Sequence, residues 1–233
     1  VYFGRKNASP FRLGKTKLYW NILGKTCTNG SSELMTNLSS SIVNTLFNFQ
    51  LMHFAGEDGV AAYGTLMYVN FIFVAIFLGY SIGSAPIVSY HYGARNSEEL
   101  KNLLTKSLKM IGVWSVALFA LAQLIASPLA RIFVGYDPNL FDLTRHGFRI
   151  FCLAFLVNGF NIYGSSFFTA LNNGLLSALI SFLRTLVFQI ASVLLLPMLF
   201  GIDGIWGAVF VAEILTLCVT IICLAKKQKV YHY

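Results

Sequence analysis

Long apolar stretches, separated by short polar segments, recur along the chain from about residue 34 onward. Six of them approach or exceed roughly 20 predominantly apolar residues, the length that an α-helix needs to cross a bilayer. They cover about 34–54, 61–90, 108–130, 148–171, 177–200 and 204–225. The pattern therefore predicts six membrane-spanning helices.

Three connections between these stretches are only a few residues long, at 55–60, 172–176 and 201–203. Short connections make successive helices run antiparallel. We therefore expect residues 31–233 to form an all-α integral membrane protein, built as a six-helix transmembrane bundle.

Composition agrees with a membrane protein. Of the 233 residues, 56% are hydrophobic and 11% are charged, whereas soluble domains carry about 25% charged residues. The mean hydropathy is +0.67. A water-soluble core of this size cannot absorb so much apolar surface, so the lipid bilayer is the expected partner.

The Lys and Arg residues predict the orientation of the helices. With the N-terminal segment in the cytoplasm, all 17 except Arg131, Arg145 and Arg149 fall on the cytoplasmic side, as the positive-inside rule requires. Both ends of the chain are then cytoplasmic, in a multi-pass protein of the cell (inner or plasma) membrane. The same placement argues against nucleic-acid binding as the reason for the net charge of +8.

Residues 1–30 alternate basic side chains with apolar ones such as Phe11, Leu18 and Trp20. Ser9 and Pro10 suit the N-cap and the first position of a helix. We expect a basic amphipathic segment on the anionic cytoplasmic surface. It is either a linker to a preceding bundle or an ordinary basic stretch beside the membrane. Because the chain begins with Val1, we expect the C-terminal part of a longer protein or a truncation.

Two of the predicted helices carry polar side chains at steps of three or four, which places them on one helix face. Polar groups in lipid are costly, so two such stripes favour a shared aqueous cavity; interhelical hydrogen bonding is the alternative. The first stripe comprises Glu33, Asn37, Ser40, Ser41, Asn44 and Asn48, and the second comprises Asn158, Asn161, Ser165, Thr169 and Asn172.

Three charged residues lie in or beside the predicted helices. Glu213, midway along the last one, is expected inside the bundle as a coupling carboxylate or as a structural hydrogen-bonding group. Glu33 is a second candidate, although an acid in a first helical turn also simply favours the helix dipole. We expect Arg184 to reach toward the cytoplasmic surface, with a contact to a substrate or a carboxylate as the alternative.

The sequence contains no HExxH, GxSxG, P-loop or CxxC pattern. The four cysteines have no metal-binding or redox spacing. We therefore predict no enzymatic activity, no catalytic residue, and no bound metal or cofactor.

Four segments, taken in order, resemble second-half landmarks of the multidrug and toxic compound extrusion (MATE) family. They are GVAAYG (59–64), GYSIGSAPIVSYHYGARN (79–96), GSSFFTALNN (164–173) and GIDGIWGA (201–208). The resemblance covers residues 30–225 and implies one lobe, helices seven to twelve, of a twelve-helix transporter. It also implies a partner lobe of six helices that this chain lacks, joined through residues 1–30.

The MATE resemblance implies export of organic cations and other small-molecule drugs in exchange for Na⁺ or H⁺. One branch of the family uses carboxylates in the seventh and tenth helices, at positions that align near Ser41 and Asn161. Neither residue is acidic. The chain is therefore more similar to the branch whose coupling acid lies in the first helix of the other lobe. Glu33 and Glu213 are candidate substitutes.

A second reading is a lipid-linked oligosaccharide flippase of the same superfamily. Such a protein needs a basic cavity to hold a pyrophosphate. Arg184 is the one basic candidate within the predicted helices, so this reading ranks below drug export.

Overall fold

The computed structural model of the protein describes residues 17–231 and 233, with 29, 32, 33, 35 and 229 described by their backbone only. All secondary structure of this part is helical. The α-helices are α1 (Trp20–Gly93), α2 (Ser97–Val134), α3 (Pro138–Phe151), α4 (Phe155–Ala170), α5 (Gly174–Phe182), α6 (Gln189–Phe200) and α7 (Ile202–Tyr231). A 3₁₀ turn, η2 (Cys152–Ala154), joins α3 to α4, and a π-helical turn, η3 (Leu183–Phe188), joins α5 to α6.

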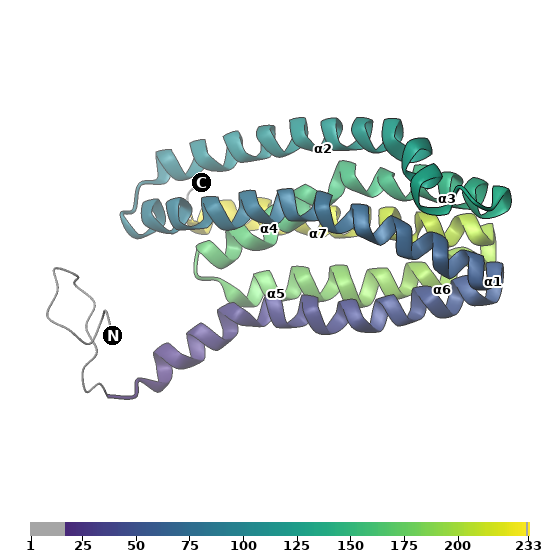
Figure 1. Ribbon diagram of the computed structural model, residues 1–233. Helices are drawn as coiled ribbons and strands as arrows, with labels where there is room; N and C mark the ends of the chain where they lie inside the picture. The colour runs from purple at the N-terminus through teal and green to yellow at the C-terminus, as the bar shows by residue number, and fades with distance from the viewer. Residues whose placement is uncertain (1–16, 232) are drawn as a thin grey trace, which may run out of the picture.

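Helix α1 contains two membrane crossings. Its 74 residues are interrupted at Gly56, which has φ 63° and ψ −150°, a backbone conformation that is essentially restricted to glycine. A straight helix of this length would measure about 110 Å, far more than the roughly 30 Å of a hydrocarbon core. The chain instead doubles back at Gly56 (Figure 1), giving a first leg (20–55) and a second leg (57–93).

The six predicted crossings are confirmed. Among the described residues, five helical segments are long and apolar enough to span a membrane: Thr36–Gly93, Ser97–Val134, Pro138–Ala170, Gly174–Phe200 and Ile202–Gln228. The first of them bends at Gly56 and crosses twice. Several helices extend beyond the predicted apolar stretches; α2, for example, begins at Ser97 rather than near 108. Its first turns are polar, so an apolar run cannot reveal them.

Short turns connect antiparallel neighbours at the two ends of the bundle (Figure 1). The turns at 94–96 and 171–173 lie at the same end as the start of α1 and the end of α7; we call this the terminal end. Asparagine side chains start the helices there, since Asn96 accepts a hydrogen bond from the N–H of Glu99 and Asn173 from that of Leu176. At the opposite end, Asp137 caps α3. These caps satisfy backbone donors that a helix start leaves unpaired.

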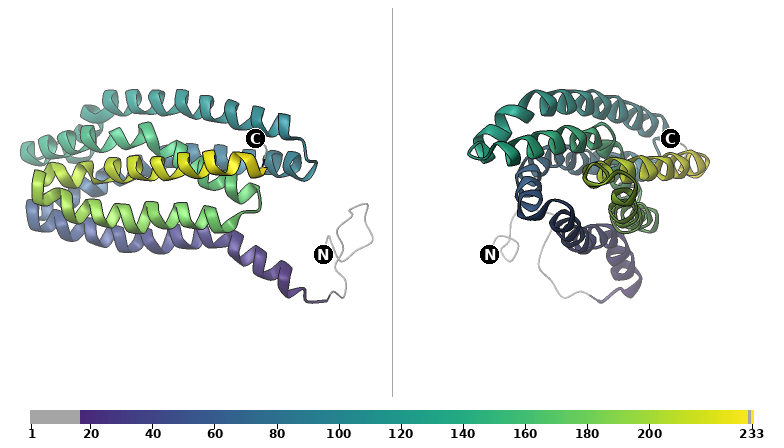
Figure 2. Two further views of the ribbon diagram at one scale, coloured as in Figure 1. Left: turned by 180° about the vertical axis from the view of Figure 1, so that it is seen from behind. Right: turned by 90° about the vertical axis from the view of Figure 1, so that its right-hand side faces the viewer.

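The span formed by α3 and α4 occupies the centre of the bundle. In its most apolar window 67% of the residues are buried, against 22–33% in the other four segments. Helix α2 lies on one side of it, and the first leg of α1 with α5 and α6 lies on the other (Figures 1 and 2). The core is aromatic and tightly packed. The ring centroids of Phe73 and Phe155 are 5.0 Å apart, and a Cβ on Gly147 would lie 2.6 Å from the Trp206 ring.

At the beginning of the described chain, α1 starts at Trp20 and continues without a break into the first crossing. Leu18, Trp20 and Ile22 are exposed there. Ser9, Pro10 and the rest of the chain up to residue 16 lie outside the described residues. The amphipathic surface segment over residues 1–30 therefore stays a prediction.

Candidate functional site

A buried ion pair lies in the middle of the bundle. Arg184 of η3 donates through Nε and Nη2 to Oε1 of Glu213 on α7, at 2.8 and 2.7 Å. The side chains are 18% and 6% exposed. Each residue lies about 15 Å along its helical segment from the preceding turn, which is half of a hydrocarbon core of roughly 30 Å. They are the only charged residues within 153–202 and 204–225.

Asparagines from α4 complete the surroundings of this pair. Asn161 donates from Nδ2 to Oε2 of Glu213 at 2.7 Å and to its backbone carbonyl at 2.8 Å. Thr220 donates to Oδ1 of Asn161 at 3.1 Å, and Asn158 accepts a hydrogen bond from Nη2 of Arg184. We call Asn158, Asn161, Arg184, Glu213 and Thr220 the ion-pair network. Both carboxylate oxygens in it accept hydrogen bonds, as a buried charge requires.

Local helix geometry brings these side chains together. Asn158 and Asn161 are three residues apart on α4, and Glu213 and Thr220 are seven apart on α7, so each pair shares a helix face. Gly164 packs directly against the methyl group of Thr220, and its lack of a side chain permits the close approach of α4 and α7. Arg184 projects from a π-helical turn, a distortion that often occurs at functional sites.

A second polar group joins α4 to α5 nearer the terminal end. Ser165 lies 2.9 Å from the hydroxyl of Ser177 and 3.0 Å from that of Ser181, and Thr169 donates to Ser177 at 2.7 Å. We call these four residues the hydroxyl cluster. Hydroxyl groups that pair across two helices hold them together where water is absent.

The predicted stripe on α4 is thus engaged in hydrogen bonds between helices. Asn158 and Asn161 are 4% and 0% exposed and belong to the ion-pair network, while Ser165 and Thr169 belong to the hydroxyl cluster. This arrangement is the hydrogen-bonding alternative that the spacing had left open. A cavity-lining role for these four residues stays a prediction.

The stripe on the first leg of α1 is arranged differently. Asn37, Ser41, Asn44 and Asn48 are all exposed, so the rest of the bundle does not cover this face of α1. Asn44 still accepts a hydrogen bond from the hydroxyl of Tyr63, at 2.9 Å. The side chain of Glu33 lies outside the described residues.

The expectation that Arg184 reaches toward the cytoplasmic surface is wrong. Its guanidinium binds Glu213 and Asn158 instead, because an ion pair compensates a charge inside the bundle. Sequence analysis also missed Thr220 and the Ser177–Ser181 pair. A signal for Thr220 was present, since it follows Glu213 by seven residues and therefore lies on the same face of α7.

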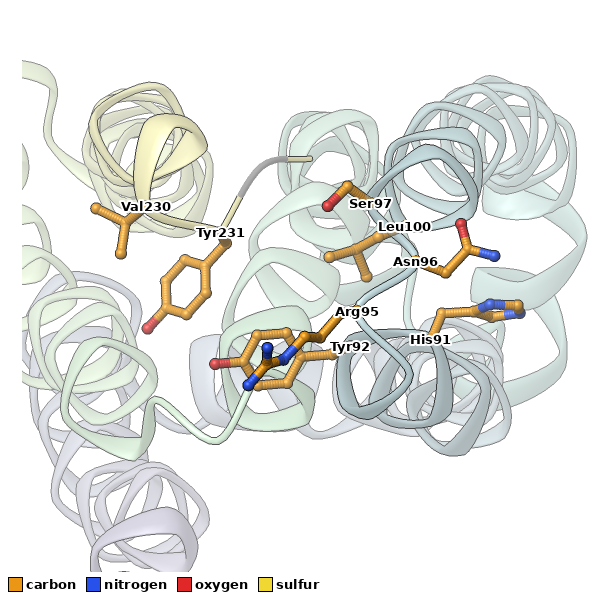
Figure 3. Close-up of a pocket in the computed structure, with 8 residues that line it drawn as sticks. All are labelled: His91, Tyr92, Arg95, Asn96, Ser97, Leu100, Val230 and Tyr231. Atoms are coloured by element: carbon orange, nitrogen blue, oxygen red, sulfur yellow. The ribbon is translucent and has the colours of Figure 1, made fainter.

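Two surface pockets lie at the terminal end, away from the ion-pair network. One of about 180 Å³ is bounded by the α1–α2 turn and the end of α7 (Figure 3). Its lining residues include His91, Arg95 and Tyr231. The other, of about 460 Å³, lies between the start of α1 and the α4–α5 turn. Among the described residues, no group of three or more His, Cys, Asp and Glu side chains could hold a metal ion.

Six antiparallel crossings define a multi-pass helical membrane protein. Its core contains a hydrogen-bonded ion pair in addition to packed apolar side chains. A family model narrows this class: the MatE model matches residues 34–195. The chain belongs to the MatE family of transporters. The MATE resemblance drawn from the sequence is therefore confirmed, and with it the prediction that this is not an enzyme.

Two curated relatives are similar over nearly the whole chain. The probable multidrug resistance protein YoeA of Bacillus subtilis (strain 168) is 22% identical over 205 residues, which are 85% of this chain and 43% of YoeA. A protein of Shewanella oneidensis named FAD transporter is 23% identical over 225 residues, 95% of this chain and 47% of that protein. The chain therefore spans about half the length of the curated relatives it matches.

Solved MATE structures share the fold at low identity. A crystal structure of MATE in complex with MaL6 superposes with a TM-score of 0.87 at 19% identity, covering 97% of this chain and 51% of that one. An outward-facing MATE family transporter gives 0.84 at 20% identity over 95% and 50%. An inward-facing one gives 0.81 at 20% identity over 93% and 50%. The chain has the fold of half a MATE transporter.

Proposed function

We propose that this chain forms the C-terminal lobe of a secondary active multidrug exporter. In this role it moves organic cations and other xenobiotics out of the cell in exchange for Na⁺ or H⁺. The observation that carries the proposal is the exposed polar stripe of Asn37, Ser41, Asn44 and Asn48 on α1. These side chains are exposed on a helix that crosses the membrane, although Asn44 also accepts a hydrogen bond from Tyr63 of the second leg.

A polar face of this kind does not suit contact with acyl chains. An amide group in hydrocarbon loses its hydrogen bonds to water, at a cost of several kcal/mol. The stripe therefore needs protein or water opposite it. The matched relatives are about twice as long as this chain, and their remaining length is enough for a second six-helix lobe. An aqueous cavity between the two lobes would give both the stripe and a drug a polar surface.

The charge distribution supports cytoplasmic ends for this chain. With Arg184 assigned to the ion pair, the remaining Lys and Arg residues keep the same bias, since only Arg131, Arg145 and Arg149 fall on the other side. The start of α1 and the end of α7 lie at one end of the bundle (Figure 1), as an even number of crossings requires. The positive-inside rule then favours the terminal end as the cytoplasmic one.

Glu213 is the coupling candidate that the geometry supports best. It is a carboxylate at mid-depth of the bundle, where an ionised group is costly. Binding of a proton or a cation would neutralise that charge. Ser41 and Asn161, near which the MATE resemblance places the acids of one branch of the family, are both neutral. Glu33 stays a candidate on the sequence alone.

Drug resistance of cells that express the full-length protein tests this proposal. Glu213→Gln should lower resistance to cationic drugs without lowering membrane abundance, whereas Asp142→Asn, at an exposed site, should leave resistance unchanged. Normal resistance with Glu213→Gln would remove Glu213 from coupling. Wild-type cells no more resistant than cells with an empty vector would contradict drug export itself.

A second candidate function is export of an anionic molecule, either a lipid-linked pyrophosphate or a nucleotide such as the flavin in the name of the Shewanella relative. Arg184, a guanidinium at mid-depth, favours it. It ranks second because Glu213 already neutralises that charge. Efflux of FAD from inverted vesicles, compared with efflux of a cationic dye, distinguishes the two functions.

A further inference from the structure

We propose that Arg184 is the core of an anion-binding site that opens when Glu213 takes up a proton. The ligand is a small monovalent anion with a carboxylate or other oxyanion group. In the closed state Arg184 binds Glu213, and in the open state it binds the anion. The site shares Glu213 with the proposed cation export, and it is tested by anion binding rather than by drug resistance.

The hydrogen bonds of Glu213 determine which oxygen receives the proton. The backbone carbonyl of Glu213 can only accept, so the Asn161 group that faces it must be the amide Nδ2. The same Nδ2 also donates to Oε2, which keeps that oxygen an acceptor. The proton therefore binds Oε1, the oxygen that Arg184 contacts through both Nε and Nη2.

Protonation at Oε1 releases the guanidinium. A carboxylic acid O–H is a donor and cannot accept two N–H groups with the strength of a carboxylate oxygen. Arg184 then keeps only its hydrogen bond to Asn158 and carries an unpaired charge at mid-depth, where such a charge is strongly unfavourable. An anion that replaces the carboxylate neutralises the charge of Arg184 again. One proton and one negative charge enter together, so the net charge of the site does not change.

The donors of the site suit an anion better than a metal cation. Both oxygens of Glu213 are already occupied by N–H donors, and a cation would have to expel a guanidinium to reach them. Arg184 itself uses Nε and Nη2, and no hydrogen bond between described residues involves its Nη1. Once Glu213 is released, the Nε–Nη2 edge of this planar guanidinium matches the geometry of a carboxylate or other oxyanion.

Other titratable groups do not compete for this pair. Helix η3 packs against α1, α5, α6 and α7, and α7 also packs against α3, α4 and η2. The titratable side chains of α3 and η2 make no hydrogen bond or ion pair with Arg184 or Glu213; they are Asp142, Arg145, His146, Arg149 and Cys152. Helices α4, α5 and α6 carry no charged residue, and Tyr163 is the one titratable side chain on them. On α1 and α7, the titratable side chains that the structure describes, other than Glu213 itself, make no hydrogen bond or ion pair with Arg184 or Glu213. On α1 they are Lys25, Cys27, His53, Glu57, Asp58, Tyr63, Tyr68, Tyr80, Tyr90, His91 and Tyr92, and on α7 they are Asp203, Cys218, Cys223, Lys226, Lys227 and Tyr231.

Binding of radiolabelled methanesulfonate to the purified full-length protein in nanodiscs tests the site. This probe is a monovalent oxyanion that does not titrate near neutral pH. Because one proton enters with each anion, the affinity for the probe should rise on acidification, by up to about tenfold per pH unit. Glu213→Gln, a permanently neutral side chain, should bind with the affinity of the acidic wild type at every pH.

Variants of Arg184 separate this site from adventitious binding. Arg184→Gln should abolish binding, and Arg184→Lys should retain it at reduced affinity. Arg145→Gln, which changes an exposed arginine, should bind like the wild type. The double variant Arg184→Gln/Glu213→Gln removes both charges, so it avoids an unpaired buried charge; it should fold and not bind.

Three outcomes would overturn the proposal: no binding by the wild type at any pH, affinity of the wild type that does not change with pH, or full binding by Arg184→Gln or by the double variant. None of them affects the drug-resistance test of export, because that test measures a different ligand.

Discussion

Gly164 of α4 lies so close to Thr220 of α7 that a Cβ at this position would overlap the threonine methyl group. The contact holds Thr220 where its hydroxyl donates to Asn161, at 3.1 Å. Asn161 in turn orients the carboxylate of Glu213. The lack of a side chain at Gly164 therefore helps to position the carboxylate of Glu213, through Thr220 and Asn161.

Gly164→Ala should destabilise the protein. Overpacking of a tight contact costs about 1–3 kcal/mol, and displacement of Thr220 removes a buried hydrogen bond as well. Thermal unfolding in detergent, monitored by the loss of helical circular dichroism, measures the effect. Gly79→Ala is the matched control, because nothing lies within 4 Å of a Cβ there. Equal stability of the two variants would mean that the α4–α7 contact can relax.

Removal of one partner of the ion pair should be more harmful than removal of both. Arg184→Met leaves a buried carboxylate without its counter-ion, which typically costs about 3–5 kcal/mol. Arg184→Met/Glu213→Leu leaves no charge and should recover most of that loss. A double-mutant cycle of unfolding midpoints measures the coupling between the two residues. Additive losses would show that the pair contributes no interaction energy.

Water access should differ between the two polar stripes. In a background with Cys27, Cys152, Cys218 and Cys223 replaced by serine, Asn44→Cys should react with a membrane-impermeant maleimide, because this position is exposed. Asn161→Cys should not react, because Asn161 is completely buried. Labelling in intact cells, followed by a gel-shift assay, reads out both. Reaction at Asn161→Cys would indicate a cavity reaching α4, and protection of Asn44→Cys would remove the aqueous face of α1.

The bend of α1 should depend on glycine at position 56. Its φ of 63° with ψ of −150° is a region that an L side chain enters at a cost of about 1–3 kcal/mol. Gly56→Ala should therefore lower the unfolding temperature and the amount of protein in the membrane. Gly64→Ala, in the regular second leg and with open space around a Cβ, should have little effect. A Gly56→Ala variant as stable as the wild type would mean that the bend can form with a different backbone conformation.

The sequence predicts most of the fold but few of the contacts between polar side chains inside the bundle. Apolar run length reveals the six crossings because lipid requires roughly 20 apolar residues in each. It cannot reveal the polar first turns of α2 or the π-helical turn at η3, since neither changes the hydrophobic pattern. Residue spacing put Asn158 and Asn161 on one face of α4, but the partner of each depends on packing between helices. Arg184 shows this limit clearly: helical position alone suggested the membrane surface, and a glutamate 29 residues away determines its contacts.

The exposed amide face of α1 also has a consequence for biogenesis. A helix with Asn37, Asn44 and Asn48 on an exposed face partitions poorly into lipid on its own, because moving amide groups from water into hydrocarbon is costly. During synthesis the first leg of α1 would therefore stay beside the translocon or another polar surface until a partner shields it. Delayed release of this segment would make lobe pairing a checkpoint at which membrane quality-control proteases recognise unassembled chains.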